Sequence, residues 1–156
     1  MFKKILVPLD GTRMAEAVLP YVRDLAAATQ AEVELLYVSM PVPAHYANID
    51  YGTALTVEKQ IRADSANYMH HTAQHLLQLG VHATVTVQSD YAAAHAIIQR
   101  AETIGADLIV LSTHGRSALV RMLEGSNTDA VIRGTHVPVL LIRPDLSDPS
   151  PDDFPA

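Results

Sequence analysis

The chain has 156 residues, 49% of them apolar and 18% charged, a composition typical of one globular domain with a sizeable core. It contains no cysteine, which excludes disulfides, thiolate nucleophiles and cysteine metal sites. The formal net charge is −6, and four of the acidic residues lie among residues 145–156. Nothing in this balance resembles the basic surface of a nucleic-acid-binding protein.

The sequence predicts neither a membrane span nor a secretion signal. No segment approaches the roughly 18 apolar residues of a transmembrane helix. The apolar run at residues 5–9 is too short for a signal peptide, and an Asp-Gly turn follows it. We therefore expect a soluble cytoplasmic protein that contacts no membrane. Residues 144–156 are rich in proline and aspartate and lack apolar periodicity, which predicts a disordered tail after a single domain at residues 1–143.

The first predicted strand leads into a helix that contains a proline. Residues 3–9 form a short apolar run without alternation, which is typical of a strand buried on both faces. A turn at residues 10–12 follows, and either Thr12 or Asp10 can cap the next helix. Pro20 lies inside that helix and predicts a kink or the loss of one backbone hydrogen bond.

A second strand, predicted at residues 32–39, leads into a long connection and a long helix. Residues 40–54 contain three turn-forming residues, which predicts a mobile loop. The helix is expected from about residue 55 to residue 79, with Gly80 after its end. Its predicted buried stripe consists of Ile61, Ser65, Tyr68, Met69, Thr72, Leu76 and Leu79.

Two more strands and a helix are expected in the following third of the chain. Residues 81–88 alternate apolar with polar residues, which predicts a strand near a sheet edge. Asp90 is the expected cap of the next helix, and Gly105 is its expected end. Residues 107–111 are an aspartate followed by four apolar residues, which predicts a fourth strand.

A short helix at residues 126–133 and a strand at residues 137–143 complete the pattern, and Pro138 favours an edge position for that strand. The order βαβαβαβαβ predicts an α/β fold: a single doubly wound, Rossmann-like domain with a five-stranded parallel sheet, strand order 3-2-1-4-5, and helices on both faces. Ligands of such sheets bind beyond the carboxyl ends of the strands, where the winding direction reverses. The loops leaving the first and fourth strands therefore flank the expected crevice.

Small residues follow the fourth strand in two groups, Ser112-Thr113-His114-Gly115 and Gly125-Ser126. Glycine lets backbone amides approach a ligand closely, and a helix start presents unpaired N–H groups. Two such elements together form an anion cradle, most often for phosphate. In the alternative interpretation the glycines are turn residues and residues 126–129 form a capping box. Both can hold, because a capped helix start still offers free amides.

Over residues 3–143 the chain resembles the universal stress protein family. Its opening, Ile5-Leu6-Val7-Pro8-Leu9-Asp10-Gly11-Thr12, is similar to the family's first-strand signature. The nucleotide-binding branch of the family carries Gly-x2-Gly-x9-Gly-(Ser/Thr) after the fourth strand. Here Ser112-x2-Gly115-x9-Gly125-Ser126 keeps that spacing, with serine in place of the first glycine.

The resemblance implies an ATP site and a homodimer. Pro8, Leu9, Asp10 and Gly11 would line the adenosine part, and Val38 would offer backbone groups to the adenine. Any Mg²⁺ would arrive with the phosphates, and the dimer would pair through the last strand, residues 137–143. Ser112 occupies the first glycine position, and His114 either reaches a phosphate or faces water. The residues expected to hold the phosphates are Gly115, Arg116, Gly125, Ser126 and Asn127.

Two departures from the family pattern support a different class of function. Ser112 adds a side chain where the motif has glycine, and Glu124 precedes Gly125 where the family usually has an apolar residue. A carboxylate pointing at a triphosphate would lower affinity. The alternative is therefore a nucleotide-free dimeric interaction module of the same family. Asp10, too, can serve only as a turn and cap residue.

Catalytic and metal-binding patterns are not expected. The chain has no P-loop, no GxGxxG and no nucleophile elbow, and no lysine follows the two glycines of the cradle. A third hypothesis, ATP hydrolysis, therefore implies slow turnover at most. His71 and His75 are spaced by four residues on the long helix, which can bring two imidazoles together. A solvated helix face is the favoured interpretation, because no carboxylate neighbours them.

Overall fold

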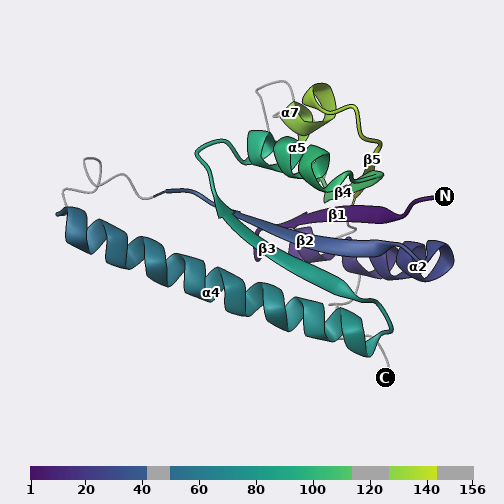
Figure 1. The fold of residues 1–156 in the computed structure, drawn as a ribbon, viewed down its shortest axis with the longest axis horizontal. Helices are drawn as coiled ribbons and strands as arrows, with labels where there is room; N and C mark the ends of the chain where they lie inside the picture. The colour runs from purple at the N-terminus through teal and green to yellow at the C-terminus, as the bar shows by residue number, and fades with distance from the viewer. Residues whose placement is uncertain (42–49, 114–126, 144–156) are drawn as a thin grey trace.

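The computed structural model describes residues 1–41, 50–113 and 127–143 (Figure 1). The strands in these residues are β1 (Lys4–Leu9), β2 (Glu32–Ser39), β3 (Ala83–Ser89), β4 (Leu108–Ser112) and β5 (Val139–Ile142). The helices are α1 (Arg13–Glu16), α2 (Leu19–Thr29), α4 (Tyr51–Gln78), α5 (Ala93–Ile104) and α7 (Asn127–Gly134).

The five strands form one parallel sheet in the order β3-β2-β1-β4-β5, which confirms the predicted fold class. The strand β1 lies at the centre, and its Ile5, Leu6 and Val7 are fully buried. The winding reverses at β1, because β2 and β3 lie on one side of it and β4 and β5 on the other. The two strands predicted to be near edges, β3 and β5, are the edges of the sheet.

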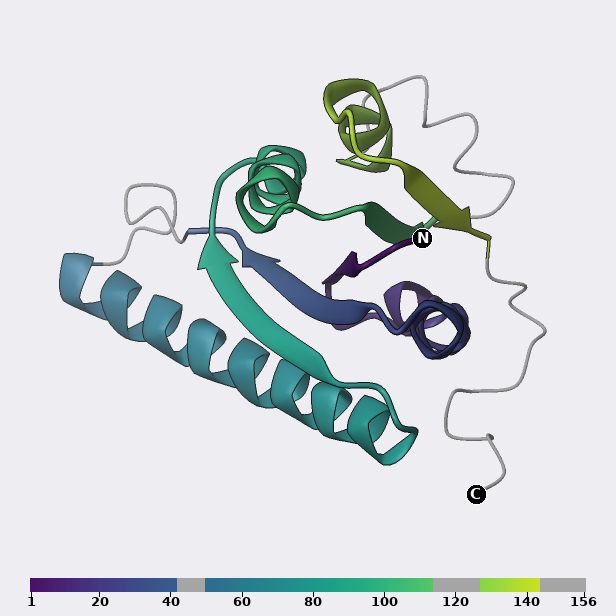
Figure 2. The same ribbon diagram turned by 45° about the vertical axis from the view of Figure 1, so that its right-hand side comes forward.

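Helices cover both faces of the sheet (Figure 2). Successive side chains of a strand point to opposite faces, so Val7 packs with α1, α2 and α4, while Leu6 packs with α5 and α7. The first core includes Val22 of α2 and Met69 of α4. The second includes Ile97 of α5. The molecule is therefore a three-layer α/β/α domain.

Pro20 divides the first predicted helix in two. Helix α1 ends at Glu16, and α2 begins at Leu19 with Pro20 in its first turn. A proline costs no hydrogen bond there, because the N–H groups of the first turn have no intrahelical partner. The predicted kink is therefore a break between two helices, and only the short α1 stays beside the end of β1.

Helix α4 begins at Tyr51, before the predicted start at residue 55. Asp50 is its cap: the Asp50 Oδ2 accepts from Thr53 Oγ1 at 2.5 Å, and Oδ1 accepts from the Thr53 N–H at 3.0 Å. These two hydrogen bonds, the side-chain one foremost, hold the pKa of Asp50 below its usual value. Gly52, interpreted from sequence as a loop residue, is helical. Of the predicted loop, residues 42–49 lie outside the described residues.

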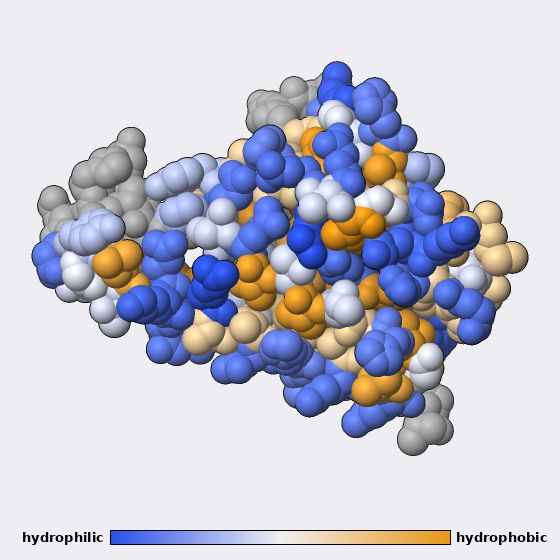
Figure 3. Space-filling model, viewed as in Figure 1, coloured by the Kyte–Doolittle hydropathy of each residue, from blue (hydrophilic) through white to orange (hydrophobic). Residues whose placement is uncertain are grey.

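Only the second half of α4 packs against the sheet. Of the predicted stripe, Ser65, Met69, Thr72 and Leu76 are buried, whereas Ile61 and Leu79 are 36% and 41% exposed. The first half, residues 51–64, extends past the carboxyl end of β3 (Figures 1 and 2). In Figure 3 the outward surface of α4 is mostly hydrophilic, with a few apolar side chains among polar ones. That pattern is expected of a helix with one face in solvent.

The start of α5 differs from the prediction, because Asp90 is not its cap. The cap residue is Ala92, which makes no side-chain cap hydrogen bond. Asp90 Oδ1 accepts instead from the Ala92 N–H at 2.8 Å, and Asp90 Oδ2 lies 3.2 Å from His95 Nδ1. Asp90 therefore closes the turn before the helix, and the backbone hydrogen bond from Ala92 lowers the Asp90 pKa. Gly105 ends α5 as predicted, with a left-handed φ of 64°.

Candidate functional site

A cavity of about 380 Å³ lies at the carboxyl end of the sheet, beside the ends of β1, β2 and β4. This is where the winding reverses, the usual ligand position in sheets of this type. Six segments of the chain contribute to the lining. The lining residues are Pro8, Leu9, Asp10, Ala15, Leu36, Val38, Ala93, Ile97, Leu111, Ser112, Thr113, Asn127 and Thr128.

The first wall is formed by the end of β1 and the turn after it. Asp10 Oδ1 accepts hydrogen bonds from the Thr12 N–H at 2.9 Å and from Thr12 Oγ1 at 2.6 Å. Thr12 in turn caps α1, because its Oγ1 accepts from the Ala15 N–H at 3.1 Å. Gly11, within this turn, has a φ of 81°. This is a left-handed backbone conformation that residues with a side chain rarely adopt. The Asp10 carboxylate is thus held in place at the wall.

The second wall combines the end of β4 with the start of α7. Ser112 ends β4, the Thr113 N–H donates to Ile142 O at 2.8 Å, and Asn127 begins α7. Gln30 is the one non-glycine residue of the described ranges with a positive φ. Ser112 therefore has an ordinary backbone conformation, and the serine in place of the motif's first glycine costs no backbone strain. The N–H groups that begin α7 stand at this wall.

The third wall is apolar. Leu36 and Val38 come from β2, Ala93 and Ile97 come from the first turns of α5, and Leu111 comes from β4. Such a surface suits an aromatic or aliphatic part of a ligand, while the first two walls offer a carboxylate, hydroxyls and backbone amides. Apolar walls with a few convergent polar groups are typical of small-molecule sites.

The structure brings six of the twelve predicted site residues to this cavity. Gly11 lies in the adjoining turn but does not line it. The remaining five, four assigned to the phosphates and His114 left open between a phosphate and water, lie outside the described residues. The six lining residues are Pro8, Leu9, Asp10, Val38, Ser112 and Asn127. The five outside the described ranges are His114, Gly115, Arg116, Gly125 and Ser126.

Sequence analysis missed the rest of the lining. Leu36 precedes Val38 by two residues, so the pleat of β2 places both side chains on the same face. Leu111 directly precedes Ser112, and the pleat gave no reason to place both at the cavity. Thr113 and Thr128 directly follow predicted site residues. Ala15, Ala93 and Ile97 come from helices. Their apolar side chains are indistinguishable in sequence from core residues.

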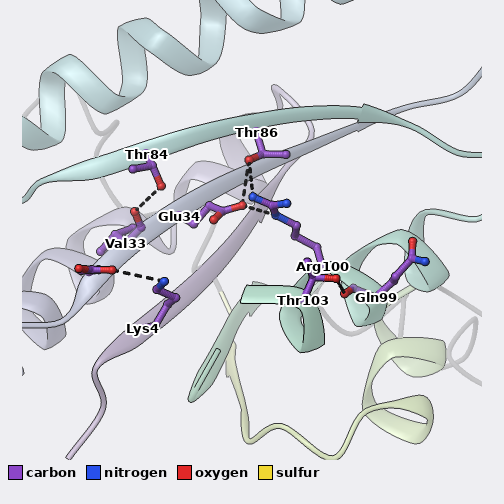
Figure 4. Close-up of polar contacts among 9 residues, drawn as sticks. Lys4, Val33, Glu34, Thr84, Thr86, Gln99, Arg100 and Thr103 are labelled. Atoms are coloured by element: carbon purple, nitrogen blue, oxygen red, sulfur yellow. Dashed lines mark hydrogen bonds and ion pairs between the residues drawn. The ribbon is translucent and has the colours of Figure 1, made fainter. Parts of the chain in front are cut away.

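A largely buried ion pair joins Glu34 of β2 to Arg100 of α5 (Figure 4). Arg100 Nε donates to Glu34 Oε1 at 2.6 Å, and Thr86 Oγ1 donates to the same oxygen at 2.9 Å. Arg100 Nη2 also donates to Thr86 Oγ1 at 3.2 Å. Glu34 precedes Leu36 by two residues on β2, and Arg100 follows Ile97 by one turn of α5. The network therefore ties β2 and β3 to α5 next to the cavity, and sequence analysis did not predict it.

Other kinds of site are not found in the part of the chain that the structure describes. No three histidine, aspartate or glutamate side chains of residues 1–41, 50–113 and 127–143 gather as a metal site. His71 and His75 lie on the exposed face of α4. No helix in the same ranges is long and apolar enough to cross a membrane.

The universal stress protein family model matches residues 1–143 of the chain. Universal stress protein MJ0577 of Methanocaldococcus jannaschii is 28% identical over 158 residues, which cover 92% of this chain and 96% of that protein. The solved structure of MJ0577 superposes with a TM-score of 0.78 at 26% identity. The superposition covers 94% of this chain and 99% of the other.

Two further solved universal stress proteins contain adenine nucleotides. One, in complex with cAMP, has a TM-score of 0.71 at 18% identity and covers 91% of this chain and 97% of its own. The other, from Archaeoglobus fulgidus in complex with dAMP, has a TM-score of 0.63 at 17% identity and covers 89% and 96%. At these identities the likeness establishes the fold, and the match of the family model over residues 1–143 establishes the lineage. This chain belongs to the universal stress protein family.

Proposed function

We propose that the chain is a cytoplasmic regulatory protein that binds ATP in the cavity at the carboxyl end of the sheet and acts as a homodimer in stress responses. The observation that supports this most is the cavity itself. It lies at the reversal of strand order and has one apolar wall facing two polar ones. Two proteins of the same fold bind adenine nucleotides, cAMP in one and dAMP in the other.

The walls suggest how the nucleotide lies. The adenine packs against the apolar wall of Leu36, Val38 and Ile97. The Asp10 carboxylate faces the base or the ribose. The phosphates extend toward the start of α7 at Asn127, where unpaired N–H groups favour an anion. Gly115, Arg116, Gly125 and Ser126 complete the phosphate contacts in this proposal, and any Mg²⁺ arrives with the phosphates.

The test is thermal unfolding of nucleotide-stripped protein. Millimolar ATP should raise the midpoint, because a ligand that binds only the folded state stabilises it by mass action. Gly125→Asp should abolish that shift while leaving the circular dichroism spectrum unchanged. Ala63→Asp, on the exposed part of α4, adds the same charge away from the cavity and should retain the shift. The absence of a shift with ATP, ADP and AMP in the wild-type protein would refute the proposal.

The second candidate is a dimeric interaction module of the same family that binds no nucleotide. Ser112 and Glu124 are its support from the sequence. The ordinary backbone of Ser112 and its place on the wall of an open cavity weaken the first point, while Glu124 lies outside the described residues. Native mass spectrometry of the protein as purified distinguishes the two. A bound adenine nucleotide rules out the second candidate.

Catalysis is not part of the proposal. We expect at most slow ATP hydrolysis, because no lysine follows the glycines of the cradle. Phosphate release would count as an activity of this chain only if it persisted through rigorous purification and disappeared in Gly115 and Gly125 variants.

The proposed dimer pairs through residues 137–143, at the edge strand β5. Pro138 O and Ile142 O accept hydrogen bonds from β4. Because N–H and C=O groups alternate sides along a strand, the amides of Val139 and Leu141 face outward, available to a partner strand. We expect a dimer mass in native spectra and slow hydrogen exchange at these two amides. A monomer at all micromolar concentrations would contradict this pairing.

A further inference from the structure

One hydrogen bond joins the long helix α4 to the wall of the cavity. Tyr68 Oη donates to Glu16 Oε1 at 2.8 Å, across 52 residues of sequence. Glu16 is the last residue of α1, and its neighbour Ala15 lines the cavity. No residue of α4 is among the lining residues in the described ranges. The long helix is therefore linked to the cavity wall by this hydrogen bond as well as by the apolar core that it shares with Leu9 and Ala15.

Helix α1 has only four residues, too few to be stable without tertiary contacts. Its start is tied to the cavity wall, because Thr12 caps α1 through the Ala15 N–H and also donates two hydrogen bonds to Asp10. Its end is tied to α4 through Glu16. Asp10, Thr12 and α1 thus form one hydrogen-bonded unit, which links Glu16 to the Asp10 carboxylate.

The Tyr68 side chain is well placed to hold that unit. Its ring lies edge-on to the ring of Tyr37, with centroids 6.4 Å apart and planes at 72°. Burial, followed by the hydrogen bond to Glu16, raises the pKa of Tyr68. The hydroxyl therefore stays protonated at physiological pH and remains a hydrogen-bond donor. The hydrogen bond is part-buried, and a donor that reaches a carboxylate makes a stronger contact than a neutral pair.

We propose that Tyr68 is a positioning residue of the nucleotide site: its hydroxyl fixes Glu16, and through α1 it fixes Asp10 and Ala15 at the cavity wall. This inference rests on the proposed binding of ATP. It also couples α4 to the bound nucleotide, since a contact that improves binding is itself strengthened by the ligand. Nucleotide occupancy is then communicated to a helix that lies outside the cavity.

The primary test is the affinity of Tyr68→Phe for ATP, measured by calorimetry. Loss of this hydrogen bond should weaken ATP binding by roughly three- to tenfold. The matched control is Tyr37→Phe, which removes the hydroxyl of the neighbouring ring while keeping the ring contact, and it should change the affinity less than about twofold. Glu16→Gln keeps a neutral acceptor oxygen, so it should weaken ATP binding less than Tyr68→Phe does. Glu16→Ala should resemble Tyr68→Phe, and the double variant should be no worse than either single one.

A second measurement separates positioning from general stability. In nucleotide-free protein, the amides of residues 12–17 should exchange hydrogen faster in Tyr68→Phe than in the wild type or in Tyr37→Phe. A Tyr68→Phe variant with a lower melting temperature but unchanged ATP affinity and unchanged exchange at residues 12–17 would overturn the inference. If the wild-type protein binds no ATP, the proposed function fails, whereas the exchange comparison still decides whether Tyr68 fixes α1.

Discussion

The two ends of the parallel sheet differ in their structure: hydrogen bonds close the amino end, whereas a cavity lies at the carboxyl end. At the amino end, Asp107 Oδ2 accepts hydrogen bonds from the Lys3 N–H at 2.8 Å and the Lys4 N–H at 2.9 Å. Two backbone hydrogen bonds pair further groups at this end: the Asp107 N–H donates to Lys4 O at 2.9 Å, and the Glu32 N–H donates to Lys3 O at 2.8 Å. At the carboxyl end the pairing of β1 with β4 stops at Leu6 and Ile109, and a cavity of about 380 Å³ lies beside the strand ends.

This contrast separates the two ends of the same strands. Strand β1 starts with its polar groups paired and ends at a turn whose Asp10 lines the cavity, where we propose that the ligand binds. Substitutions at the closed end should therefore change the free energy of unfolding without changing ATP affinity. Substitutions at the open end should change affinity, and they should affect stability only where they remove a cap or a core contact.

The largest effect on stability is expected between the two ends, at the buried ion pair. Arg100→Ala leaves the Glu34 carboxylate buried without its cation, with the Glu34 side chain only 9% exposed. The free energy of unfolding should fall by about 2–3 kcal/mol, below the full value for a deeply buried pair because Arg100 is partly exposed. Urea denaturation measures the loss. Arg133→Ala, which breaks an exposed pair with Asp129, should cost less than about 0.5 kcal/mol. Equal losses in the two variants would contradict this account of the network.

A smaller effect is expected at the open end, from Thr12→Ala. The variant removes the cap of α1 and the hydroxyl hydrogen bond to Asp10, while the backbone N–H of residue 12 still donates to Asp10. It should lower the free energy of unfolding by about 1 kcal/mol and also weaken ATP binding. Thr103→Ala, which loses only a hydroxyl contact on the surface of α5, serves as the control. A Thr12→Ala protein with normal ATP affinity would break the proposed division between the two ends.

The smallest effect is expected at the closed end, from Asp107→Asn, and it depends on pH. The backbone hydrogen bonds from Lys3 and Lys4 lower the pKa of Asp107 in the folded protein. A lowered folded pKa stabilises the protein above the unfolded value of about 3.9, and this contribution is lost as the pH falls through the folded pKa. The melting temperatures of the variant and the wild type should therefore differ at pH 6 and converge in strong acid. ATP affinity should be unchanged, and a change would show that the two ends are not independent.

The fold could be predicted because its strands are short apolar runs separated by clear helix and turn signals. Residues 3–9 and 107–111 can be buried on both faces only in a sheet with helices on both sides. The reversal of strand order then fixed the region of the cavity, and Asp10 and Ser112 lie in it. Periodicity and topology were sufficient for the fold and for the end of the sheet at which the cavity lies, and the family resemblance supplied the individual residues.

Features that depend on contacts between distant residues were not predicted. Glu34 stands within an apolar strand, and its partner Arg100 lies 66 residues later, so no local pattern connects them. Ala93 and Ile97 of the cavity wall have side chains that would suit any core. The start of α4 was placed too late because the cap at Asp50 precedes Gly52, a residue with low helix propensity.

The unequal packing of α4 gives this helix a mechanical property. With Tyr68 as a fixed point, the tip at Tyr51 lies about 25 Å away, at 1.5 Å per residue. A tilt of about 5° around that point would move the tip by about 2 Å. A small rearrangement beside the cavity that tilts α4 would therefore displace a surface of the protein far from the cavity.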